Sequence, residues 1–217
     1  MALGPQTLDR IARHWAERLD CPPSAFREPG VTSAESPSPD TVRLLRRGDA
    51  LVVAVPEDAG GRSVATIHGP FVLTYVDASR FSPVDSAARM LDPGEESAFE
   101  GLRERAPADD WRRASPTFRP GRTAGLAENG NLVAAATVTD APFPDVGVVV
   151  AREYRGRGHG RAVVSAVTAA AFDADPGVAV RYRTPASATA SISLAASLGF
   201  ERWARSAVLV LTQAGRP

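Results

Sequence analysis

The stretch Val146-Gly-Val-Val-Val-Ala-Arg-Glu-Tyr-Arg-Gly-Arg-Gly-His-Gly-Arg161 predicts a strand, a glycine-rich turn and a helix in direct succession. Its first five residues form an apolar, β-branched run that is typical of a buried strand. Three glycines then alternate with arginine and histidine, and a helical apolar pattern follows over 161–173. Backbone N–H groups at a helix N-terminus, with guanidinium groups beside them, suit the binding of a diphosphate.

Two common phosphate-binding loops do not fit this stretch. The dinucleotide fingerprint G-x-G-x-x-G requires glycine at the position of Arg161, and the Walker loop requires a lysine. The chain has no lysine, so all 25 basic residues are arginine, which also excludes Schiff-base chemistry on lysine. The pattern that remains is Arg155-x-x-Gly158-x-Gly160, or else a plain glycine-rich turn that joins a strand to a helix.

A second pattern follows downstream. Residues 178–183 predict another strand, and Thr184-Pro185 predicts the N-cap and first residue of a helix. This helix is expected to end at Gly199. The run Ala190-Ser-Ile-Ser-Leu-Ala-Ala-Ser-Leu-Gly-Phe200 belongs to it, and a last strand is expected over 207–211.

These two patterns together resemble the GCN5-related N-acetyltransferase (GNAT) family. Arg155-x-x-Gly158-x-Gly160 is similar to its acyl-CoA signature Q/R-x-x-G-x-G/A, and the run 190–200 is similar to its second motif, N-x-A-S followed by a helix that ends L-G-F. The resemblance covers residues 86–212. It implies an α/β (α+β) fold, in which helices flank a mixed, mostly antiparallel sheet whose central strands splay apart.

The resemblance also implies a division of the chain. Residues 86–217 are expected to form the GNAT acyltransferase domain, and residues 1–85 an N-terminal α/β region. This first region carries no chemistry that we can name. It is either a degenerate copy of the acyltransferase half or a plain structural extension.

In the family, pantetheine inserts between the splayed strands, and this implies a donor site. Backbone groups of Val148 and Val150 are expected to bond its amides, and an N–H near Val149 to meet the oxyanion. Ser191 of the second motif completes the expected cofactor-binding set. The diphosphate is expected to lie against Arg155, Gly156, Arg157, Gly158, His159, Gly160 and Arg161, and the His159 ring is expected to point outward. Arg152 or Arg161 is expected to reach the 3′-phosphate.

The catalytic residues are less defined by the sequence. Asp145 precedes the central strand and is the candidate base, but simple alternation places it opposite in phase to Val146 unless a β-bulge intervenes. Asp140 and Glu128 are further candidates. The asparagine and tyrosine usual in the family fall at Ala188 and Ala195. This leaves Ser191, Ser193, Tyr182 or water as the acid.

These observations predict an N-acyltransferase that moves an acyl group, most simply from acetyl-CoA, directly to an amine of a small molecule or a protein. One alternative is an acyltransferase whose donor is an acyl carrier protein and whose acceptor is an amine or an alcohol. Another is a non-catalytic CoA-binding protein.

The composition limits other functions. The formal net charge is zero, which argues against a nucleic-acid partner. The single cysteine, Cys21, excludes an internal disulfide and a cysteine-rich zinc site, and we expect no metal. No signal peptide and no membrane segment is recognisable, so a cytoplasmic location is expected.

The rest of the chain predicts conventional elements. Helices are expected over 6–20, with Thr7 as N-cap, and over 95–105. Strands are expected over 41–45, 51–55 and 71–76, with 63–68 undecided between strand and helix. Residues 27–40 predict a loop, and His68-Gly-Pro70 a turn. Residues 107–125 predict either an acceptor-binding loop or a short helix around Trp111. Asn129-Gly130 predicts a type I′ hairpin turn.

Overall fold

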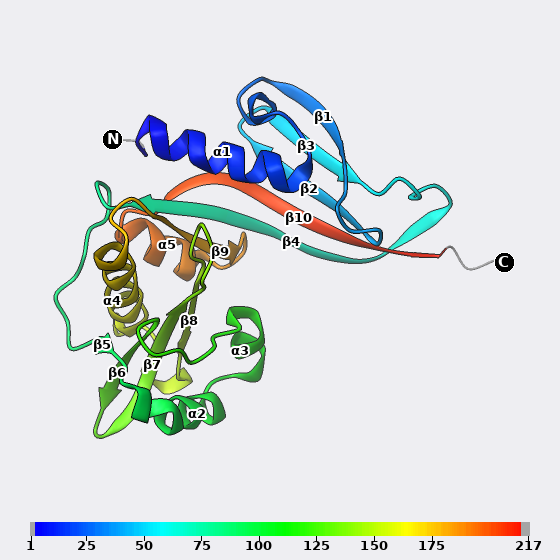
Figure 1. Cartoon of the computed structure of the whole chain (residues 1–217). Helices are drawn as coiled ribbons and strands as arrows, with labels where there is room; N and C mark the ends of the chain where they lie inside the picture. The colour runs from blue at the N-terminus through cyan, green and yellow to red at the C-terminus, as the bar shows by residue number, and fades with distance from the viewer. Residues whose placement is uncertain (1–2, 214–217) are drawn as a thin grey trace. The chain divides into compact units, whose positions relative to one another are not determined.

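The computed structural model describes residues 3–213, which form two compact units (Figure 1). The first unit runs to Thr74 and adds Thr184–Thr189 and the chain from Arg202, and the second unit consists of Tyr75–Arg183 and Ala190–Glu201. The sequence predicts one boundary after residue 85, whereas the structure draws the first unit from both ends of the chain. Local periodicity predicts the last strand but not the sheet in which it pairs.

The first unit is built on a sheet whose order is β1-β3-β2-β10-β4-β9, and its strands β4, β9 and β10 contribute residues to both units. The elements are α1 (Pro5–Leu19), the short 3-10 helix η1 (Pro23–Phe26), β1 (Gly30–Glu35), β2 (Thr41–Arg47), β3 (Ala50–Val55), β4 (Arg62–Asp77) and β10 (Glu201–Gln213).

Helix α1 confirms the predicted N-terminal helix. Ile11 and Leu19 are fully buried, and the Trp15 ring stacks on Trp203 with centroids 6.4 Å apart. The N-cap is Gly4 rather than the predicted Thr7. Pro5 follows at the first helical position. An N–H at this position would have no partner within the helix, so its absence in proline costs nothing.

Two predictions in the first unit are wrong. The predicted loop over 27–40 contains β1, which pairs in parallel with β3 over its whole length. Its residues are mostly exposed, so it lacks the apolar alternation that identifies a strand. The turn predicted at His68-Gly-Pro70 lies within β4, which also resolves the undecided segment 63–68 as strand.

The second unit carries a four-stranded sheet of order β5-β6-β7-β8. Its elements are β5 (Arg89–Met90), η2 (Pro93–Glu95), α2 (Glu96–Arg105), α3 (Ala108–Ala114), β6 (Thr123–Glu128), β7 (Asn131–Val138), β8 (Val146–Val150), η3 (Arg152–Tyr154), α4 (His159–Ala174), β9 (Ala179–Pro185) and α5 (Thr189–Ser197).

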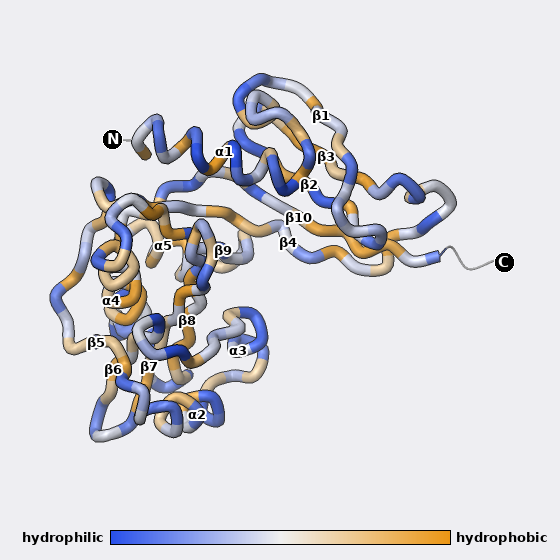
Figure 2. Tube along the Cα trace, viewed as in Figure 1, coloured by the Kyte–Doolittle hydropathy of each residue, from blue (hydrophilic) through white to orange (hydrophobic). Residues whose placement is uncertain are grey.

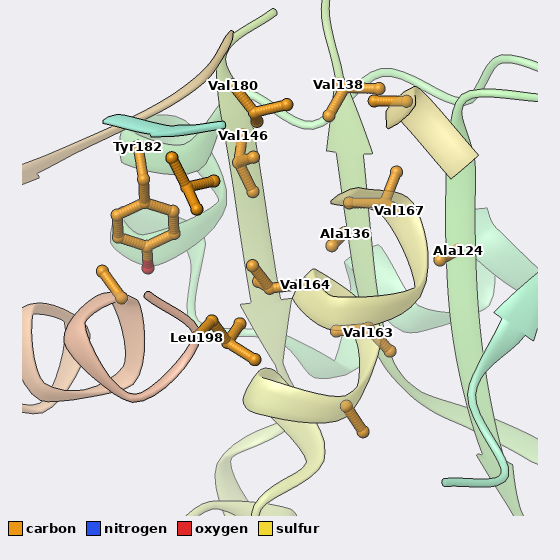
Figure 3. Packing of buried hydrophobic residues seen from close by; sticks show 14 of the residues in the cluster. Ala124, Ala136, Val138, Val146, Val163, Val164, Val167, Val180, Tyr182 and Leu198 are labelled. Atoms are coloured by element: carbon orange, nitrogen blue, oxygen red, sulfur yellow. The ribbon is translucent and has the colours of Figure 1, made fainter. Parts of the chain in front are cut away.

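The core of the second unit lies between α4 and its strands. Val163, Val164 and Val167 of α4 are fully buried and belong to one cluster with Val146 and Val180 (Figure 3). The hydropathy colouring shows this apolar content as orange segments along β7, β8 and α4 (Figure 2). Burial on this scale, at about 25 cal/mol per Å² of apolar surface, fixes the position of α4 against β8.

Three local predictions in the second unit are confirmed. Asn129 and Gly130 both adopt positive φ, 51° and 76°, as a type I′ turn requires. Of the two predictions for 107–125, a short helix forms, α3, and its Trp111 packs edge-on against Phe99 at 5.2 Å. Gly199 adopts φ 89° after α5, as expected for a helix-ending glycine.

The start of α5 differs from the prediction. Thr184 and Pro185 close β9 instead of opening a helix, and α5 begins at Thr189. A residue before proline favours an extended conformation, which suits a strand as well as an N-cap position. The pairing of β9 in the sheet decides in favour of the strand.

Candidate active site

Strands β8 and β9 diverge from a single point of contact. β8 is the edge strand of one sheet and β9 the edge strand of the other. Within residues 3–213, the backbone bridge between them is the parallel pair Asp145↔Arg181, supported by the Arg181 N–H, which donates to the Pro144 carbonyl at 2.8 Å. This is the splay that the family resemblance implies, and its vertex lies at Asp145.

Only alternate backbone groups of β8 point toward β7. The Ala151 N–H donates to the Val133 carbonyl and the Asp145 carbonyl accepts from Thr139, so the odd-numbered residues from 145 to 151 face β7. The N–H and C=O groups of Val148 and Val150 therefore face away from β7, as expected for binding an extended amide chain. The Val149 N–H faces β7, so the oxyanion donor expected near it has to come from a neighbouring residue.

The glycine-rich turn leads directly into the N-terminus of α4. Gly156 and Gly158 adopt φ values of 77° and 83°, and Gly158 is the N-cap of α4. In the described structure no side chain caps this helix, and its first intrahelical bond is from the Ala162 N–H to the Gly158 carbonyl. The N–H groups of His159, Gly160 and Arg161 thus remain for an anion.

Gly160 lies where α4, β8 and α5 come together. A Cβ at this position would be 3.1 Å from Leu194 Cδ1 and 3.4 Å from Val150 Cγ2. Glycine therefore allows the first turn of α4 to approach the end of β8 closely.

Arg155 is held by a carboxylate of α3. Its Nη2 donates to Asp110 Oδ2, and its Nε donates to the Val150 carbonyl at 3.4 Å. Asp110 also accepts from Arg113 at 2.5 Å. Burial acts to raise the pKa of Asp110, but the hydrogen bonds from Arg155 and Arg113 outweigh it, so this pKa lies below its ordinary value. Asp110 is thus a charged partner that an incoming phosphate has to replace.

The other polar side chains of the loop also lie beside acceptor groups. His159 Nε2 lies 2.8 Å from Glu128 Oε1, and Arg157 Nη1 lies 3.6 Å from Glu128 Oε2. The His159 side chain is 12% exposed, so the expectation that its ring points outward is wrong. Glu128 draws the ring inward, and only the backbone N–H of His159 remains for a ligand. The Arg161 Nη2 donates to the Ser197 carbonyl at 3.3 Å.

Asp145 lies at the vertex in an ion pair. Its Oδ2 accepts from Arg181 at 3.0 Å, while its Oδ1 is buried and has no hydrogen-bond partner in the structure. Burial acts to lower the pKa of Arg181, but the Asp145 charge and a hydrogen bond to Tyr75 outweigh it and raise this pKa above its ordinary value. Arg181 is therefore a permanent cation beside Asp145.

The structure contains no β-bulge in β8 that would turn Asp145 to the other face. The pairing of β7 with β8 is continuous from Val146 to Val150, and the register shift in this sheet lies in β6. Asp145 therefore shares a face of β8 with Gly147. A Cβ at Gly147 would lie 2.5 Å from the Ala114 carbonyl oxygen, so this face is the one against which α3 packs.

The two further candidate bases lie elsewhere. Glu128 is bound to His159 and Arg157 beside the glycine turn, and Asp140 is bound to Arg119 and Arg122. Five residues of β-strand separate the vertex from the turn, which is roughly 16 Å at about 3.3 Å per residue. Of the three carboxylates, Asp145 is the one at the vertex.

The positions of the family's usual polar residues are apolar here. Ala195 is completely buried in α5, and Ala188 precedes this helix. The nearby Tyr182 of β9 is 3% exposed, and its hydroxyl points toward α5 (Figure 3) and hydrogen-bonds Ser191. Burial raises the pKa of Tyr182 and outweighs the lowering by Ser191, so the phenol keeps its proton.

Three residues of the site are not among the predicted site residues. Asp110, Tyr75 and Arg181 contact the predicted residues only through the tertiary structure, with Asp110 and Arg155 separated by 45 positions. The charged cluster around Trp111 is the one feature that points toward Asp110, because the sequence predicts a short helix there.

The splayed strand pair and the glycine-rich turn at a helix N-terminus are the features that the family resemblance predicts for an acyltransferase. Residues 89–200, more than half of the chain, match the family model described as "Acetyltransferase (GNAT) family". The chain therefore belongs to the GNAT acetyltransferase family, and it is an acyltransferase.

Solved structures support the same fold. The chain is 23% identical to a protein of the GNAT family from Novosphingobium aromaticivorans, with a TM-score of 0.55 over 82% of this chain and 77% of that one. A GCN5-related N-acetyltransferase from Sphaerobacter thermophilus gives 19% identity and a TM-score of 0.55, covering 80% of this chain and 61% of that one. A tandem GNAT protein from the clavulanic acid biosynthesis pathway gives 18% identity and a TM-score of 0.53, covering 82% and 64%.

Because these identities are no higher than 23%, the three structures support the fold but do not indicate a substrate. A comparison with curated proteins finds no match. Among residues 3–213, no helix combines the length and the apolar character needed to cross a membrane.

Proposed function

We propose that the protein transfers an acyl group from acetyl-CoA, or another acyl-CoA, directly to an amine of a small molecule or a protein. The observation that carries this proposal is the exposed Arg155–Gly158 turn at the uncapped N-terminus of α4, which follows the edge strand β8. The turn supplies N–H donors and guanidinium groups for the diphosphate. Val148 and Val150 supply the backbone groups for the pantetheine amides.

The same arrangement orients the thioester. A chain bound along β8 from the turn runs toward the vertex, so the acyl carbonyl lies near Val148. The Val148 N–H, which faces away from β7, is the donor that we assign to the developing oxyanion. Alignment of donor and acceptor by such fixed groups contributes several kcal/mol to lowering the barrier.

The acceptor is expected to meet the thioester near the vertex, where Asp145 lies. We assign Asp145 as the base. Its Oδ2 is bonded to Arg181 and its Oδ1 is covered, so the groups that cover Oδ1 have to move before it can accept the proton of the attacking amine. A positioned base of this kind typically contributes about 10²–10⁴ in rate. A neutral amine then attacks the thioester carbon, and the thiolate leaves.

Arg155→Glu tests the donor site. We expect this change to weaken CoA binding at least tenfold, or about 1.4 kcal/mol, because it replaces a phosphate-binding cation by a repelling charge. Isothermal titration with CoA measures the effect. Arg112→Glu is the matched control, since Arg112 is an exposed arginine of the same unit that pairs with Asp109. An unchanged affinity in Arg155→Glu would refute the assignment of the turn.

Asp110→Asn is expected to have the opposite effect. Asp110 competes with the diphosphate for Arg155, so its neutralisation should tighten CoA binding by up to about fivefold, within the range of about 0.2–1 kcal/mol for an exposed ion pair. Asp109→Asn on the same helix is the control, because Asp109 pairs with Arg112 and not with Arg155. Equal or weaker binding of CoA by Asp110→Asn would show that this pair does not compete with the donor.

An activity assay also tests the alternative that the acyl donor is attached to a carrier protein. Turnover with free acetyl-CoA supports CoA as the donor, and turnover with a loaded carrier alone supports the carrier. The arginines of the turn are already paired with Asp110 and Glu128, which makes them a weak docking surface for an acidic carrier. The cytoplasmic location stays a prediction.

A further inference from the structure

The first unit contains a pocket of about 490 Å³ lined by arginine and aromatic side chains. This volume lies within the usual range of about 300–1,000 Å³ for small-molecule sites. The charged residues that line it are three arginines and one aspartate: Arg27, Arg47, Arg202 and Asp49. Phe26 and Trp203 form its buried aromatic part.

Arg47 is the central residue of this pocket. It ends β2, is partly buried, and holds its guanidinium carbon 5.6 Å from the centroid of the Trp203 ring. Its Nη1 donates to the Phe26 carbonyl at 3.1 Å. Burial lowers the pKa of Arg47, and the nearby charge of Arg27 lowers it further.

Two arginines with well-covered side chains are ion-paired, whereas the half-buried Arg47 is not ion-paired within residues 3–213. Arg62, with a side chain 11% exposed, pairs with Asp40 at 2.5 Å. Arg181, at 18%, pairs with Asp145 at 3.0 Å. Among the described residues, Arg47 has no carboxylate oxygen within ion-pair distance. A half-buried cation without an ionised partner is open to an anion from solution.

The neighbouring groups favour a multiply charged anion. Arg27 is already bonded to Asp9 of α1, and Arg202 is exposed at the start of β10. Guanidinium groups that converge on one space suit the several oxygens of a phosphate better than the two of a carboxylate. We propose that this pocket binds the phosphate group of a small molecule, with Arg47 and Arg202 as its main ligands.

Pyrophosphate titrated into the Arg155→Glu variant, in which the proposed donor turn is weakened, tests this site. We expect binding that weakens as salt is raised. Adding Arg47→Gln should weaken it at least tenfold, and adding Arg202→Gln should weaken it about threefold. Arg18→Gln is the matched control, because Arg18 lies 5.9 Å from the Trp15 ring centroid in the same unit and does not line the pocket.

Each result of this titration decides the proposal. Loss of binding in Arg47→Gln and Arg202→Gln, with Arg18→Gln unchanged, supports the site. If the Arg47→Gln variant does not fold, the pyrophosphate affinity of the Arg202→Gln variant, which changes an exposed residue, decides the proposal. No binding of pyrophosphate at millimolar concentration, equal binding of acetate, or binding that both variants retain overturns the proposal. Because the N–H groups of α4 remain in the Arg155→Glu variant, binding that both pocket variants retain is assigned to the donor turn and not to this pocket.

Discussion

Asp145→Asn is expected to lower kcat/KM at least 100-fold, with CoA affinity unchanged. Asparagine keeps the shape of the side chain but cannot accept the proton of the attacking amine, and a positioned base contributes about 10²–10⁴. Thiol release from acetyl-CoA, measured across a panel of amines with wild type and variant, is the readout. A variant that turns over the same amines at the wild-type rate would remove Asp145 from the mechanism.

Two controls accompany this substitution. Asp140→Asn neutralises a carboxylate that pairs with exposed Arg119 and Arg122, and it should leave the rate within about twofold. Asp145→Asn also leaves Arg181 without its ionised partner, which costs stability. Retained CoA binding by Asp145→Asn separates a loss of the base from a loss of the fold.

Gly199→Ala is expected to destabilise the second unit by about 3 kcal/mol or more. Gly199 adopts φ 89°, and a Cβ there would lie 2.0 Å from the backbone oxygen of Arg80, which is too close for any contact. The left-handed conformation costs about 1–2 kcal/mol, and forced repacking adds about 1–3 kcal/mol. Urea unfolding followed by circular dichroism measures the loss.

Gly130→Ala isolates the steric part of that loss. Gly130 has a similar φ of 76°, but a Cβ there would have nothing within 4 Å. Gly130→Ala should therefore cost only the conformational contribution of about 1–2 kcal/mol. If Gly199→Ala and Gly130→Ala cost the same, the close approach of Gly199 to Arg80 is not a constraint on the fold.

Local patterns predict the parts of this site that lie close together in the sequence. The strand over 146–150, the turn at Gly156 and Gly158, and the helix after it follow from β-branched residues, glycines and helical spacing. The hairpin follows from the dipeptide Asn129-Gly130, because both residues tolerate the positive φ values that they adopt. In each case the neighbours in the chain decide the structure.

Contacts between distant residues escape such patterns. Whether a bulge turns Asp145 depends on the register of β7 against β8, and the position of the His159 ring depends on Glu128 across the hairpin. Edge strand β1 pairs without an apolar pattern, because half of its backbone groups and most of its side chains face water. These features depend on contacts between residues that are far apart in the sequence, so they can be identified only from the folded structure.

A crystal structure of the protein with CoA bound tests the central claim most directly. We expect the diphosphate on the N–H groups at the N-terminus of α4, Arg155 turned from Asp110 to a phosphate, and the pantetheine amides paired with Val148 and Val150. CoA bound elsewhere, with the turn at Gly156–Gly160 unchanged and Arg155 still on Asp110, would contradict the account.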